Sequence, residues 1–202
     1  MRRLCLATAV ALAASGLLAA CSVGQPGGPV TLTRSAVRDG QTVSAWQYSA
    51  ARGPVLLEVW GSPTGQPPAA FARTLADVMP SPPFHQRARW TLDPAQAGDP
   101  DNRIVLMFGS PVAARGAVPC DDPRAVPVAQ GMPDGTAIQM TFCSGDSAMG
   151  ETRITGPAVD GPADPLLHEM LRRGLGKVVP PRATEFDDGK RLMDRRCLFP
   201  FC

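Results

Sequence analysis

Proline and glycine limit how far any helix or strand of this chain can run. The 202 residues include 22 prolines and 20 glycines, which is above average usage. Proline ends helices and is excluded from central strands, and both residues mark turns. We therefore expect short elements joined by many ordered turns. The hydrophobic fraction of 44% is too high for wholesale disorder.

The N-terminus is typical of an export signal. Arg2 and Arg3 precede an almost unbroken apolar run over residues 4–18, and the small residues Ala19 and Ala20 follow. This is the layout of a secretory signal peptide, which takes no part in the mature fold. The run is shorter than the roughly 20 apolar residues of a membrane-spanning helix, and no later segment is apolar enough to span. We expect residues 1–20 to be removed.

The end of this leader has a more specific pattern. Leu18-Ala19-Ala20-Cys21 resembles the lipobox of bacterial lipoproteins. The resemblance implies that the Cys21 thiol receives a diacylglycerol, that cleavage occurs just before it, and that the new amino terminus is acylated. Several acyl chains give stable anchoring, and a neutral Ser22 fits delivery to the periplasmic face of an outer membrane. The alternative is an ordinary signal peptide cut near Ala20, which leaves Cys21 as a free thiol.

Removal of the leader also changes the size and charge of the chain. Residues 21–30 are small, polar and rich in Pro and Gly, as in a flexible tether. Residues 31–202 suit a single domain with an irregular C-terminal tail. Loss of Arg2 and Arg3 lowers the 20 Lys and Arg residues to 18, equal to the 18 Asp and Glu residues. A balanced charge argues against a nucleic-acid partner.

Hydrophobic periodicity predicts the elements of this domain. Alternation or short apolar runs indicate strands, and an apolar face of period 3.6 indicates helices. A long Pro- and Gly-rich connection fills residues 109–135. The order of elements predicts an α+β fold, with a single mixed or antiparallel sheet of four to six strands and two helices packed on one face. The expected strands are 42–48, 54–60, 87–92, 103–108, 136–143 and 152–155, and the expected helices are 69–79 and 164–178.

Four cysteines remain once the leader is removed and Cys21 carries lipid: Cys120, Cys143, Cys197 and Cys202. An even number in an exported chain suggests disulfides, and four cysteines allow three connectivities. We favour Cys120–Cys143 and Cys197–Cys202; a competing pattern ties the tail to the body, for example through Cys143 and Cys202. The chain has no CxxC pair of the kind that binds zinc, so we expect no metal and no cofactor.

The motif CSGDSAMG, residues 143–150, resembles the nucleophile loop of trypsin-like serine proteases. Ser147 would then need a histidine oriented by an acid. The sequence departs from that family because Ala148 and Met149 replace the expected glycines. Neither His85 nor His168 stands in the family's sequence context. A hairpin turn explains the same residues.

Other polar candidates have equally ordinary explanations. His168 begins an H-E-x-x-H pattern whose second ligand position holds Arg172, and one histidine does not make a zinc site. Asp99 and Asp101 have the spacing of two acidic ligands in a calcium-binding loop, but the terminal Glu of that pattern does not follow. We therefore interpret both as turn residues. The adjacent acids at 121–122 and 187–188 give no evidence of a convergent acid–base pair.

Three tryptophans fall on expected strands: Trp46, Trp60 and Trp90. Aromatic side chains on strands usually fill the core. They can also line a groove for a ligand or partner. Core packing is the interpretation that we favour.

The segments VLLEVWGSPTG, FARTLADVM, RWTLDP and RIVLMFG, followed by a cysteine, look like a family of small exported bacterial proteins whose activity is not characterised. The hypothesis is therefore a lipid-anchored protein of the cell envelope that binds or scaffolds an envelope protein. A lipid-anchored hydrolase and a carrier of a small hydrophobic ligand are the alternatives. The lack of a convergent histidine and acid favours binding over catalysis, and a carrier predicts an apolar pocket between sheet and helices.

Overall fold

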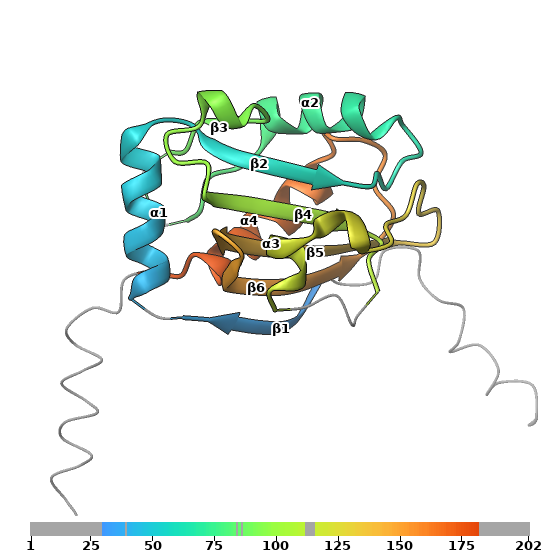
Figure 1. The fold of residues 1–202 in the computed structure, drawn as a ribbon. Helices are drawn as coiled ribbons and strands as arrows, with labels where there is room; N and C mark the ends of the chain where they lie inside the picture. Colours follow the sequence, from blue (N-terminus) through green and yellow to red (C-terminus); the bar gives the residue numbers. More distant parts are fainter. Residues whose placement is uncertain (1–29, 39, 84, 86, 112–115, 182–202) are drawn as a thin grey trace, which may run out of the picture.

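A computed structural model describes residues 30–38, 40–83, 85, 87–111 and 116–181 (Figure 1). Within these residues the architecture is α+β, as the order of elements predicts. Two short 3₁₀ turns, η1 (Pro94–Gln96) and η2 (Pro123–Ala125), complete it. The strands and helices are β1 (Thr31–Val37), α1 (Gln41–Arg52), β2 (Val55–Trp60), α2 (Pro68–Val78), β3 (Trp90–Thr91), β4 (Asn102–Phe108), α3 (Val118–Asp121), β5 (Thr136–Ser144), β6 (Ser147–Gly156) and α4 (Pro165–Val178).

The strands form one mixed sheet in the order β1-β6-β5-β4-β2-β3. The hairpin of β5 and β6 and its neighbours β4 and β1 pair antiparallel. Strand β2 instead runs parallel to both β4 and β3. The chain leaves β2, forms α2 and returns to the same edge as β3, which is the crossover that a parallel pair requires.

Helices cover the two faces of this sheet unequally. Helices α1, α2 and α4 pack on one face through a large buried cluster that includes Trp46, Phe71, Phe142 and Leu171. The short α3 lies on the opposite face, where Cys120 joins a small cluster of β4 and β5 side chains. The expected arrangement of two helices on one face is therefore wrong in detail. The helix-covered face carries three, and a fourth lies across the outer face.

Residues 42–48, expected as a strand, belong to α1. Their buried side chains are Thr42, Val43, Trp46 and Ser49, a spacing that follows the helical period. Alternation along 42–48 places polar and apolar residues on both sides of a strand, so it cannot bury one clean face. A helix instead turns Trp46 fully into the core, where its ring lies 5.9 Å from that of Phe142.

The two expected helices and four of the other expected strands are present. Asp164 caps α4, because its Oδ1 accepts a hydrogen bond from the Leu166 N–H at 2.7 Å. The apolar face of α4 then packs on β6 closely enough that glycine is required at the contact. A Cβ on Gly150 would lie 2.4 Å from the Val178 carbonyl oxygen. No helix in the described part of the chain is long and apolar enough to cross a membrane.

The expected strand at 87–92 is reduced to the two residues of β3. It pairs only with Val55 and Leu56 of β2, and the chain then turns away through Asp93 into η1. Pro94 at the start of η1 is the residue that cannot continue a strand. Among the described residues, the second half of β2 therefore has a neighbouring strand, β4, on one side only.

Candidate functional site

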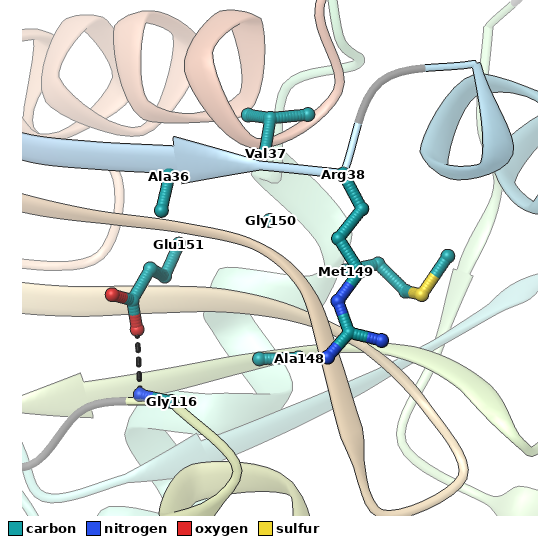
Figure 2. A pocket seen from close by; sticks show the side chains of 8 residues that line it. All are labelled: Ala36, Val37, Arg38, Gly116, Ala148, Met149, Gly150 and Glu151. Carbon is teal, nitrogen blue, oxygen red and sulfur yellow. Dashed lines mark hydrogen bonds between the residues drawn. The ribbon is translucent and has the colours of Figure 1, made fainter.

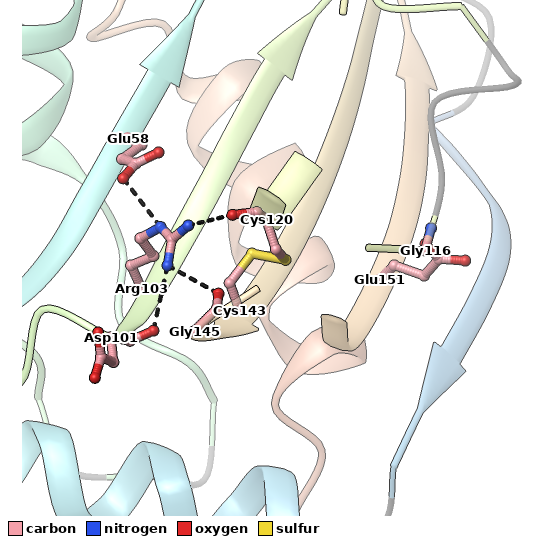
Figure 3. Close-up of a disulfide and its surroundings, with 8 residues drawn as sticks. All are labelled: Glu58, Asp101, Arg103, Gly116, Cys120, Cys143, Gly145 and Glu151. Atoms are coloured by element: carbon pink, nitrogen blue, oxygen red, sulfur yellow. Dashed lines mark hydrogen bonds and ion pairs between the residues drawn. A yellow bond between two sulfur atoms is a disulfide. The ribbon is translucent and has the colours of Figure 1, made fainter. Parts of the chain in front are cut away.

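The predicted disulfide between Cys120 and Cys143 is present, with their Cα atoms 5.6 Å apart (Figure 3). Both cysteines are almost fully buried. The bond joins residues 23 apart in sequence, and a loop of that length is worth about 3 kcal/mol in the chain-entropy model. It holds α3 against the outer face of the sheet. Its role is structural.

Arg103 of β4, beside this disulfide, has partners on β2, on α3 and in the turn between β5 and β6 (Figure 3). Its Nε lies 3.0 Å from Glu58 Oε1 on β2, and its other nitrogens donate to the carbonyls of Gly145 at 3.1 Å and of Cys120 at 2.5 Å. The Arg103 side chain is only 13% exposed. Arg103 Nε makes this ion pair without forming a hydrogen bond, and the terminal nitrogens supply the hydrogen bonds to backbone carbonyls. These partners hold the partly buried arginine as a fixed structural group.

The outer face also carries polar side chains near its middle. Arg153 on β6 donates to the Ser110 carbonyl at 2.9 Å, and burial lowers the pKa of this guanidinium from its ordinary value. Gln139 and Thr141 on the adjacent β5 are buried. These groups support the segment that crosses the outer face and present no unpaired acid and base.

A small hollow of about 170 Å³ lies between the end of β1 and the start of β6 (Figure 2). Arg38 and Glu151 are its charged side chains. Glu151 Oε2 already accepts a hydrogen bond from the Gly116 N–H at 2.8 Å, and Arg38 is exposed. One engaged carboxylate and one solvated cation do not make an acid–base pair.

A larger groove, of about 650 Å³, runs along the open edge of β2 under the first turns of α2. Residues 57–60 of β2 form its floor, and the chain leaving β3 at Leu92 and Asp93 closes one end. Ala69, Ala72 and Arg73 line the α2 side. Its volume falls within the range of ligand sites, and its walls are mainly apolar with a few polar groups.

The charged groups in this groove are not equally free. Glu58 is paired with Arg103, and Asp93 accepts from the Ala95 N–H and from Gln96 Nε2 at the start of η1. Arg73 uses only its Nε, in a bond to the carbonyl of Ala69. Its terminal nitrogens have no partner among the described residues. The groove therefore presents an unused positive charge.

The structure does not bring a histidine to Ser147. Ser147 begins β6 directly after the hairpin turn and pairs with Ser144. His85 Nε2 lies 2.9 Å from the Pro180 carbonyl, and His168 is exposed on α4. In the described part of the chain no histidine hydrogen-bonds Ser147, so the arrangement that a serine nucleophile needs is missing there.

The acidic candidates take part in turn and surface contacts. Asp99 accepts from the Asp101 N–H and from the Asn102 side chain, which is turn chemistry. Asp121, the last residue of α3, and Asp122 after it are exposed, and the pair at 187–188 lies outside the described residues. No group of three potential metal-ligating side chains gathers among the residues that the structure describes.

The tryptophans divide between core and groove. Trp46 is fully buried and lies 5.8 Å from Trp90 between ring centroids. Trp60 lines the groove. Cys21, Cys197 and Cys202 lie outside the described residues, so lipidation and the second disulfide stay predictions.

The groove itself could not be found from the sequence. It exists because β3 stops after two residues while β2 continues, and the pairing length of two distant segments leaves no local pattern. The one available signal was Pro94, which follows the expected strand at 87–92. No family model, curated protein or solved structure matches this chain.

Proposed function

We propose that this chain is a lipid-anchored protein of the cell envelope, delivered to the outer membrane, that binds a partner protein. The leader over residues 1–20 and the lipobox that ends in Cys21 support the export and the lipid anchor. The binding role is carried by one observation, the open groove along the second half of β2. The Pro- and Gly-rich composition of residues 21–30 favours a tether between the anchor and the domain, as the sequence predicts.

Binding is better supported than catalysis because of the chemistry of the groove. Of its three charged side chains, Glu58 and Asp93 already have partners, and the third is an arginine. General acid–base work needs a titratable group within reach of a substrate proton. The carrier alternative has less support, since large buried side chains fill the space between the sheet and its three helices and the groove opens at the edge instead.

The anchor is tested by labelling cells with an alkyne fatty acid while they produce the full chain. Label is expected in the wild type and in Ser22→Ala, and is expected to be lost in Cys21→Ala. Retention of label in Cys21→Ala would show that Cys21 is not the attachment point.

The binding role is tested with a photo-crosslinking amino acid placed in α2 of the full chain in intact cells. Ala69 lines the groove, whereas Thr74 is exposed on the same helix outside it. A discrete light-dependent adduct is expected from position 69 and not from position 74. The same adducts from both positions, or none from position 69, would contradict a partner at the groove.

A further inference from the structure

We infer that the groove binds an extended peptide segment of the partner, which adds as a strand to the free edge of β2 and places an acidic side chain beside Arg73. This inference rests on the proposed binding function and specifies its partner chemistry. Three observations support it: the unpaired backbone groups at the edge of β2, the shape of the groove wall formed by α2, and the charged side chains that line the groove.

The edge of β2 offers backbone groups with no partner. The Val55 N–H donates to the Arg89 carbonyl at 2.7 Å, so the main chain of Val55 faces β3. Successive residues of a strand alternate, and Leu57 and Val59 therefore face the same edge. Pairing with β3 ends at Leu56. The Val59 N–H and C=O consequently have no hydrogen-bond partner among the described residues, and an added strand would supply one.

The wall above this edge suits alternate side chains of a strand. Ala69 and Ala72 are small, and with Leu92 they leave an apolar recess. Arg73 stands one turn of α2 after Ala69. One helical turn advances about 5.4 Å, and two residues of a strand advance about 6.6 Å. An apolar side chain in the recess thus places the side chain two residues away close to Arg73.

The charges that line the groove determine which peptide side chain is preferred beside Arg73. Glu58 and Asp93 are engaged within the protein, whereas the terminal nitrogens of Arg73 are unused by the described residues. A carboxylate can pair with an arginine through two parallel hydrogen bonds. The preferred peptide therefore alternates, with an apolar residue and an acidic residue on the side facing α2.

A peptide fits this edge better than a second folded copy does. The unpaired stretch spans only the second half of β2, and a stable protein interface needs roughly 1,000 Å² or more. The opposite edge of the sheet, β1, is built differently, since its register with β6 shifts between Thr33 and Ser35. Such a bulge discourages the addition of another strand. Addition of a strand to an open edge is a known mode of peptide recognition.

The test is selection of a random phage-displayed dodecapeptide library on the mature chain, followed by affinity measurements with the selected peptides. Peptides with alternating apolar residues and an acid are expected. Ala69→Trp fills the recess and is expected to weaken binding at least about tenfold, or ~1.4 kcal/mol. Thr74→Trp, on the same helix, is the matched control and is expected to bind normally. Equal thermal midpoints of the two variants show that both fold.

Two further measurements separate a strand from another binding mode. Arg73→Glu is expected to reject the acidic peptides and to bind versions in which the acid is replaced by lysine. The Val59 amide is expected to shift in a ¹⁵N–¹H spectrum and to lose that shift when alternate peptide amides are N-methylated. No enriched peptide, equal binding by Ala69→Trp and Thr74→Trp, or binding that survives N-methylation would each overturn the inference. An adduct from position 69 in cells together with any of these results would leave the binding function standing.

Discussion

The two faces of the sheet are held by different means. The helix-covered face buries a continuous apolar cluster from α1, α2, α4 and four strands. The outer face buries only a small cluster, around Val105, Met107 and the disulfide, and depends on that bond and on Arg103 to hold its covering segment. A face closed by apolar burial has no room for a partner. At the edge of the sheet, β3 pairs with only two residues of β2, so backbone groups further along β2 can hydrogen-bond a partner.

The largest expected loss of stability is on the helix-covered face. Phe142→Ala should lower the free energy of unfolding by about 3–5 kcal/mol, because Phe142 is fully buried against Trp46. Urea denaturation measures the loss, and Tyr48→Ala is the control, since Tyr48 is 53% exposed. Similar losses in the two variants would contradict the assignment of the main core to this face.

Loss of the disulfide should have the next largest effect. The double variant Cys120→Ala/Cys143→Ala is expected to have a free energy of unfolding about 3 kcal/mol lower than the wild type. The loss comes from the outer face, where the bond lies. Reducing agent should bring the wild type to the stability of the double variant. A wild type that reductant does not affect would contradict a stabilising bond between these cysteines. A further loss in the reduced double variant would reveal a contribution from Cys197 and Cys202.

Arg103 should contribute less than the disulfide. Arg103→Met is expected to cost about 1.5–3 kcal/mol, the range for hydrogen bonds to charged groups, and it also leaves Glu58 without its ion pair. Adding Glu58→Gln should return part of the loss because the two side chains are coupled. Strict additivity of the two losses would show that the ion pair has no energetic role.

The smallest effect is expected at the exposed surface of α4. Glu169 accepts hydrogen bonds from Arg172 and Arg173, and these lower the pKa of its carboxyl to about 2. The folded pKa lies below the unfolded one, so the stabilisation is present at neutral pH and declines as pH falls from about 5 toward 2. Solvent screening keeps it to a few tenths of a kcal/mol.

Glu169→Gln should accordingly be slightly less stable than the wild type at pH 7, and the two should converge near pH 2. Urea denaturation across this range measures the difference. A difference that stays constant with pH would exclude the carboxylate as its source.

The sequence predicted the parts of the fold whose pattern is local. The run at 103–108 and the alternation at 136–143 became central strands, and Asp164 and Pro165 marked the start of α4. The Cys120–Cys143 pair was also predicted. The prediction of a strand at 42–48 was wrong because a short segment of mixed polarity fits both the two-residue period of a strand and the 3.6-residue period of a helix. Packing on β4 and β6 selects the helix. The groove depends on where β3 stops pairing, which is decided by tertiary structure.

Hydrogen exchange within β2 tests the central claim most directly, that this edge of the sheet is open. Val59 faces the free edge, whereas Glu58 and Trp60 face β4 by alternation, so one strand contains both the test and its controls. Exchange followed by NMR on the mature chain should be fast at the Val59 amide and slow at Glu58 and Trp60. Equal protection of all three amides would show that the edge is already paired and would contradict the account.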